Sequence, residues 1–186
     1  TAPARLGEVT AFVSHSWSDP GDAKYVHLHA FAAHTASPLC SIWLDKACIS
    51  QDNIDANLAC LPIYLSGCDW LLVLAGRSYG TRLWCVVELF VYLRMGGRRE
   101  SVATRLLDES ADLPFLLSRF DAATSRCFLD RDRQKLLAVI EAAFGTFEPF
   151  NKIVREIFAS NPQQAASGRP SAASGIQFTS VHVPTP

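Results

Sequence analysis

The sequence lacks several features that would assign it to a common class of protein. Neither sign of charge is in excess, because 17 Lys and Arg residues balance 18 Asp and Glu residues to a net charge of −1. Nucleic-acid-binding proteins usually carry a basic excess, so the composition argues against a nucleic-acid partner. The longest apolar run, Trp70–Ala75, is far shorter than the roughly 20 residues of a membrane-spanning helix. With 49% hydrophobic residues, the chain can nevertheless bury a core.

Closely spaced cysteines are also lacking. No C-x-x-C motif occurs, and the recurring interval of seven intervening residues is longer than zinc sites favour. Most of the cysteines stand beside or within apolar segments, which is typical of free thiols in a reducing compartment. We therefore expect free thiols, no bound metal and a cytoplasmic location; disulfides or a metal site are the alternatives. The six residues are Cys40, Cys48, Cys60, Cys68, Cys85 and Cys127.

Short apolar runs alternate with segments of helical periodicity along the chain. Trp70–Ala75 is apolar at every position, which is typical of a strand buried on both faces of a parallel sheet. The alternation predicts a three-layer α/β/α domain around a parallel sheet of five strands. The expected strands are Thr10–Ser14, Cys40–Leu44, Trp70–Ala75, Ser101–Leu107 and Arg126–Leu129. The expected helices begin at Asp22, span Ile54–Leu65, Tyr79–Arg94, Leu113–Phe120 and Arg131–Phe144, and resume at Pro149.

The composition changes after residue 160. Residues 161–186 contain four of the ten prolines, two glycines and four serines, and Arg169 is their one Lys, Arg, Asp or Glu residue. This composition is typical of a flexible tail. We therefore expect a leader at 1–9, a domain at 10–160 and a flexible Pro/Ser/Gly-rich tail at 161–186 that is dispensable for folding.

Common nucleotide and hydrolase motifs are missing as well. The sequence has no G-x-G-x-x-G, no G-x-x-x-x-G-K-[ST] and no G-x-S-x-G, which argues against the usual phosphate cradles and a nucleophile elbow. A phosphoacceptor receiver domain would need an Asp where Ala75 and Gly76 stand. In parallel α/β domains, ligands bind beyond the carboxyl ends of the strands. The loops at His15–Asp22 and Gly76–Tyr79 are therefore the expected binding loops.

Glu88 is an isolated charge in an apolar segment. Leu83–Leu93 reads LWCVVELFVYL, so Glu88 stands on a helix that is apolar nearly all round. Two interpretations remain open at this point. Glu88 lies at a solvent-facing edge or pairs with a distant Arg, or it lines a cleft beside Trp84, where an apolar environment raises its pKa.

Three segments of the sequence resemble Toll/interleukin-1 receptor (TIR) domains. VSHSWSD (Val13–Asp19) resembles their first strand and its loop, and IWLDK (Ile42–Lys46) resembles their second strand and the start of the BB loop. The block from Ile63 to Leu89 resembles their I-x-x-S…Y…W-C-x-x-E-L block, with Trp84, Cys85 and Glu88 at the matching spacing. The resemblance covers about Thr10–Leu93 and implies a flavodoxin-like sheet of five parallel strands in the order 2-1-3-4-5.

The resemblance implies two functions. One TIR branch cleaves the nicotinamide–ribose bond of NAD+, giving nicotinamide and ADP-ribose or cyclic ADP-ribose, with the Glu of the block as catalytic residue. The other branch acts in signal transduction through non-catalytic protein–protein interaction. The catalytic residue maps onto Glu88, whose presence favours NAD+ cleavage, with NAD+ as substrate and no further cofactor. The other expected site residues are Trp84, Ser14, His15, Ser16 and Trp17, which would bind the substrate.

Homotypic TIR–TIR association is the second expectation from the resemblance. It implies an interaction loop after the second strand, with Asp45, Lys46, Gln51 and Asp52 as candidates. The region Asp45–Asp55 lacks the Gly and Pro residues that many members carry there, which weakens the case for association through this loop.

Overall fold

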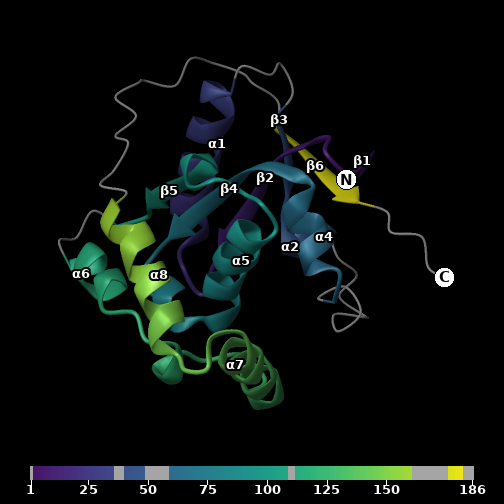
Figure 1. The fold of residues 1–186 in the computed structure, drawn as a ribbon. Coiled ribbons are helices and arrows are strands. Elements are labelled where there is room, and N and C mark those ends of the chain that lie inside the picture. The colour runs from purple at the N-terminus through teal and green to yellow at the C-terminus, as the bar shows by residue number, and fades with distance from the viewer. Residues whose placement is uncertain (1, 36–39, 49–58, 109–111, 161–175, 182–186) are drawn as a thin grey trace.

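The computed structural model describes residues 2–35, 40–48, 59–108, 112–160 and 176–181. These residues form a parallel six-stranded sheet with helices on both faces, which confirms the predicted α/β class (Figure 1). The sheet order is β1-β6-β3-β2-β4-β5. The strands are β1 (Ala2–Ala4), β2 (Val9–His15), β3 (Cys40–Trp43), β4 (Cys68–Ala75), β5 (Val102–Leu106) and β6 (Ile176–Val181).

The helices follow the periodic segments of the sequence closely. The α-helices are α1 (Gly21–His34), α2 (Asp45–Cys48), α4 (Leu61–Ser66), α5 (Leu83–Arg94), α6 (Asp112–Ser118), α7 (Asp130–Phe144) and α8 (Glu148–Ser160). Three 3-10 turns, η1 (Tyr79–Thr81), η2 (Arg99–Ser101) and η3 (Ala122–Thr124), complete the described elements. The predicted stop at Gly145 is confirmed, because this residue caps α7 with a φ of 77° that glycine adopts without steric cost. Residues 54–58 of the predicted helix Ile54–Leu65 lie outside the described residues.

The sheet separates two apolar clusters, because successive side chains of a strand point to opposite faces. One cluster lies between the sheet and α1; it contains Ala11, Val13, Leu28, Phe31, Ala32, Cys40, Ile42, Leu72 and Leu74. The larger cluster joins the opposite face to α4, α5, α7 and α8, and its buried strand residues include Phe12, Trp43, Leu71 and Val73. The domain is therefore layered as predicted, with α5 covering the centre of the sheet.

Four of the five predicted strands form, and their order agrees with 2-1-3-4. They are β2, β3, β4 and β5, and each neighbouring pair is parallel. The fifth prediction, Arg126–Leu129, is wrong. Arg126 makes one isolated bridge to Arg82, with its N–H donating to Thr81 O and its C=O accepting from Leu83 N. Beyond Arg126 the segment turns toward solvent, and the Phe128 side chain is 87% exposed. The segment therefore adds no strand beside β5.

The sheet extends instead at its opposite edge. Ile176–Val181 pairs with β3 and, on its other side, with β1. Ile176–Val181 was predicted to belong to the flexible tail and Ala2–Ala4 to the leader, so both strands are unexpected. Residues 161–175 and 182–186 lie outside the described residues.

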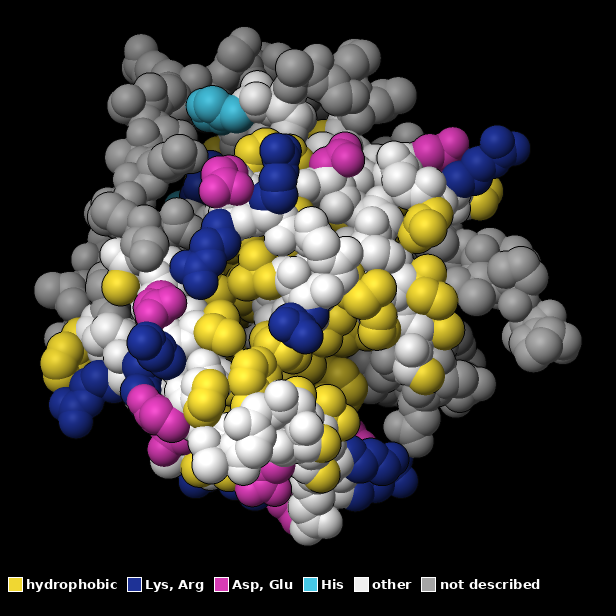
Figure 2. Space-filling model, in the orientation of Figure 1, with side chains coloured by type: hydrophobic (Ala, Val, Ile, Leu, Met, Phe, Trp, Pro, Cys, Tyr) yellow, Lys and Arg dark blue, Asp and Glu magenta, His cyan; other side chains and the backbone are white. Residues whose placement is uncertain are grey.

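Apolar side chains also reach the surface over α5. Figure 2 shows them gathered in the middle of the face that α5 occupies in Figure 1, with charged side chains around them. This agrees with the sequence of α5, in which Glu88 is the one charge before Arg94. Among the described residues, no helix is both long enough and apolar enough to cross a membrane.

Candidate active site

The carboxyl ends of β2, β3 and β4 lie at one edge of the sheet, as parallel pairing requires. The register places Ser14 opposite Val73 and His15 opposite Leu74, so the loops after β2 and β4 leave the sheet together. Helix α2 follows β3 and begins at Asp45, whose carboxylate contacts the loop after β2. The binding loops predicted from the sequence are therefore adjacent in space, and the N-terminal half of α5 packs against them.

Glu88 contacts the end of β2 through a hydrogen bond with Ser14. The Ser14 hydroxyl donates a hydrogen bond to Glu88 Oε2 at 2.6 Å, a length typical of charge-assisted bonds. Ser14 is fully buried, whereas Glu88 keeps partial exposure to solvent. Burial raises the pKa of Glu88 to about 8; the Ser14 hydrogen bond opposes this shift and the nearby Asp45 charge adds to it. The structure leaves Glu88 partly exposed and gives it a serine rather than an arginine as its hydrogen-bond partner.

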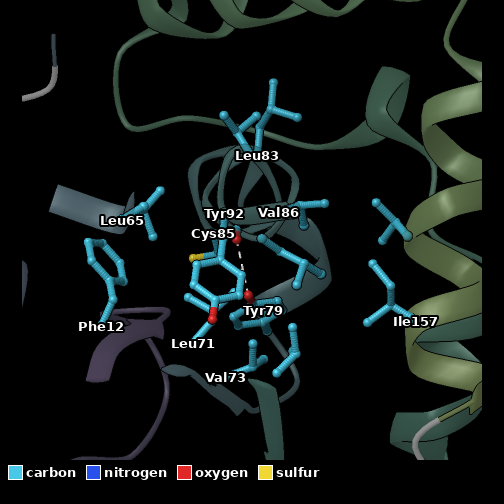
Figure 3. Close-up of a cluster of buried hydrophobic side chains, with 14 of the residues drawn as sticks. Phe12, Leu65, Leu71, Val73, Tyr79, Leu83, Cys85, Val86, Tyr92 and Ile157 are labelled. Carbon is cyan, nitrogen blue, oxygen red and sulfur yellow. Dashed lines mark hydrogen bonds between the residues drawn. The ribbon is translucent and has the colours of Figure 1, made fainter. Parts of the chain in front are cut away.

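A buried tyrosine lies behind Ser14. Tyr79 OH is 2.8 Å from Ser14 Oγ and donates to the Cys85 carbonyl at 3.0 Å. Figure 3 shows the Tyr79 ring within the apolar cluster, with its hydroxyl turned toward Cys85. Burial raises the pKa of Tyr79 well above its ordinary value, so it stays a neutral phenol. The sequence analysis gave Tyr79 no role, although it belongs to the block that resembles TIR domains.

The Asp45 carboxylate connects the loop after β2 to the start of α2. Trp17 Nε1 donates to Asp45 Oδ2 at 2.6 Å, and His15 Nε2 lies 3.3 Å from Oδ1. Burial alone would raise the pKa of Asp45, but the hydrogen bonds from His15 and Trp17 outweigh it and hold the pKa below its ordinary value. Lys46 lies 5.5 Å from the Trp17 ring centre, within cation–π range.

This contact brings together residues that the sequence analysis separated. Asp45 and Lys46 are expected in an interaction loop, yet they contact His15 or Trp17, which are expected to bind substrate. Trp17 remains 51% exposed at the rim of the site. Gln51 and Asp52, the other two interaction-loop candidates, lie outside the described residues.

Ser16 belongs to a second polar cluster, which closes the loops after β2 and β4 onto each other. Ser78 Oγ bonds to Ser16 Oγ at 2.6 Å and to Asp19 Oδ1 at 2.8 Å, and Ser78 N also donates to Asp19. The Asp19 carboxyl lies directly over Gly76, where an added Cβ would come within 2.3 Å of Asp19 Cγ. The close approach of the Asp19 carboxyl group therefore requires glycine at position 76. Neither Asp19 nor Ser78 was predicted as a site residue.

The remaining members of the W-C-x-x-E pattern pack against the core. Trp84 is partly exposed and contacts the larger apolar cluster. Cys85 is buried, its thiol donates to the His15 carbonyl at 3.3 Å, and burial raises its pKa well above the ordinary value. Lys24 brings a positive charge near Asp19, Cys85 and Asp45, although burial lowers its pKa. Within the described part of the chain, no group of three or more His, Cys, Asp or Glu side chains is placed to hold a metal ion.

Comparison of the chain with protein-family models, with curated proteins and with solved structures gives no match.

Proposed function

We propose that this chain is a divergent TIR-like domain that cleaves the nicotinamide–ribose bond of NAD+, with Glu88 as the catalytic carboxylate. The observation that carries the proposal is the position of Glu88. It is a single carboxyl group on an apolar helix, partly exposed and hydrogen-bonded to the end of the central strand β2. This is the edge at which parallel α/β domains bind their ligands. The proposal includes the flavodoxin-like relation of the domain and a cytoplasmic location.

The chemistry of the bond suits a lone carboxylate. Cleavage builds positive charge on the ribose, as in glycoside hydrolysis, and nicotinamide leaves as a neutral base that needs no general acid. Glu88 in its ionised form stabilises that charge electrostatically. Asp45, whose pKa is held below its ordinary value, adds negative charge nearby. Trp84 and Trp17 supply aromatic surface for the bases of NAD+.

The test is the release of nicotinamide from NAD+ by the wild-type chain and two variants. Glu88→Ala and Glu88→Gln should both lose about 10²–10³ in rate while remaining folded. Glu141→Ala is the matched control, because Glu141 is an exposed glutamate on α7, far from these loops along the chain. The assay is run at low and high protein concentration, because many TIR enzymes turn over only when self-associated. Unchanged turnover in Glu88→Ala would remove Glu88 from the reaction.

A non-catalytic signalling module that binds a second copy of the domain is the alternative outcome. It would be supported if the wild-type chain released no nicotinamide at any concentration but formed dimers or larger assemblies in light scattering. The partly exposed apolar side chains that Figure 2 shows in the middle of this face are the observation that supports this alternative.

A further inference from the structure

Two buried hydroxyl groups, those of Ser14 and Tyr79, form a chain of contacts that ends at the Glu88 carboxyl group. Ser14 Oγ has three polar neighbours: Glu88 Oε2 at 2.6 Å, Tyr79 OH at 2.8 Å and the Cys85 carbonyl at 3.3 Å. Ser14 and Tyr79 are both fully buried, and they come from β2 and η1, which both contact α5. Neither hydroxyl is placed in the open part of the site, which argues against direct substrate binding by Ser14.

The Glu88 carboxyl group keeps a hydrogen bond to Ser14 whether it is ionised or protonated. When Glu88 is ionised, Ser14 donates to the carboxylate, while Tyr79 donates to Ser14 or to the Cys85 carbonyl. When Glu88 is protonated, its O–H donates to Ser14, which turns its own proton to the Cys85 carbonyl. The change needs the rotation of one hydroxyl group and no movement of heavier atoms. A buried network of this kind fixes the side chain that it contacts.

The charged and titratable groups around Glu88 do not replace Ser14. Asp45 at the start of α2 disfavours the ionised carboxyl, and Cys85 and Tyr79 stay neutral because burial raises the pKa of each. Arg82, at the beginning of α5, acts on the Cys85 thiol. Among burial, Asp45 and Ser14, the serine is the influence that favours the ionised form of Glu88.

We propose that Ser14, supported by Tyr79, is a positioning residue that orients the Glu88 carboxyl group and favours its ionised form. This inference rests on the proposed function, because it assigns a role to Ser14 through the carboxylate that the reaction needs. It changes the expected role of Ser14 from substrate contact to control of the catalytic group.

The direct test is a titration of the Glu88 carboxyl carbon by NMR, with its signal assigned by its loss in Glu88→Gln. The wild-type midpoint should lie near pH 8. In Ser14→Ala the midpoint should rise by about one unit, because a hydrogen bond to the charged form is lost. Tyr79→Phe should shift it upward by less. Ser16→Ala is the matched control. It removes a buried hydroxyl of the same loop, but this hydroxyl bonds to Ser78 and not to Glu88. The Glu88 midpoint should therefore not move.

The pH profile of NAD+ cleavage separates positioning from a structural role. Ser14→Ala should cleave about tenfold more slowly than wild type near neutral pH and recover toward the wild-type rate as the pH rises past the new midpoint. A loss that is equal at every pH, or equal midpoints in Ser14→Ala and wild type, would overturn the inference. A shifted midpoint in a chain that releases no nicotinamide would leave Ser14 as the partner of Glu88 and reject the proposed function instead.

Discussion

Glu88 is a carboxyl group whose burial makes stability depend on pH. The pKa of Glu88 is raised from 4.5 to about 8, so the folded chain keeps a proton that the unfolded chain has released between these values. The free energy of unfolding should therefore fall as the pH rises from about 4.5 to about 8, and the penalty should persist above that range. Glu88→Gln removes this dependence, and its amide oxygen still accepts from Ser14. We expect the variant to exceed wild type by on the order of 2 kcal/mol at pH 9, a discounted value because Glu88 is partly exposed.

Urea unfolding at a series of pH values measures this difference. The two proteins should be equally stable near pH 4 and diverge as the pH rises through the Glu88 transition. Curves that stay parallel from pH 4 to pH 9 would contradict a raised Glu88 pKa. A variant less stable than wild type at every pH would instead indicate a structural ion pair.

Residue patterns predicted Glu88 and Ser14 as site residues, but not the hydrogen bond between them. A single carboxylate among LWCVVELFVYL is visible in the sequence, because an apolar helix leaves few explanations for one charge. Its partner Ser14 is 74 residues away, and the clamp between Asp19 and Ser78 spans 59 residues. Side-chain bonds of this range depend on how the loops meet at the edge of the sheet, which no local pattern specifies.

Elements were predicted well where apolar periodicity is strong and poorly at the edges of the sheet. β4, α5 and α7 follow from continuous or periodic apolar runs. Ile176–Val181 lies in a segment rich in Pro, Ser and Gly, so it was not predicted as a strand, although it pairs on both sides. Arg126–Leu129 has a short apolar pattern and was predicted as a strand, although it makes one isolated bridge. The backbone partner of each segment decides whether it becomes a strand of the sheet. Arg126 bonds to residues at the start of α5, whereas β6 pairs with β3.

Strand β6 leads to a prediction about truncation. A chain that ends at Ser160 loses β6, which removes the backbone bonds to β3 and leaves β1 without its partner in the sheet. The gain from these bonds is partly offset by the entropy of ordering the tail. We expect a loss of about 1 kcal/mol, or roughly 2–4 °C in Tm for a chain of this length.

Thermal unfolding of three chains tests the contribution of β6. A chain ending at Val181 is the matched control, because it keeps every described residue and should melt with the full chain. Equal Tm values for the chains ending at 160 and 181 would show that residues 161–186 are dispensable, as their composition suggests.

The whole molecule shields its thiols to different depths. None of the six cysteines forms a disulfide; Cys40, Cys68 and Cys85 are buried, whereas Cys48, Cys60 and Cys127 are partly exposed. A buried thiol reacts only when the fold opens, so its labelling rate reports the stability of the surrounding core. Cys68 and Cys85 belong to the larger apolar cluster, and Cys40 belongs to the cluster beside α1. Their labelling therefore reports on both faces of the sheet.

Alkylation of the native chain without reductant, followed by mass spectrometry, should therefore give two classes of sites. Cys48, Cys60 and Cys127 should react first, and Cys40, Cys68 and Cys85 should react at least about 10²-fold more slowly. Unfolding in urea should make all six reactive, because none is engaged in a disulfide. Urea below the unfolding transition should accelerate the three buried sites together if the two clusters open as one cooperative unit. Faster labelling of Cys40 alone would mean that the α1 face opens independently, and a site that stays protected in urea would contradict six free thiols.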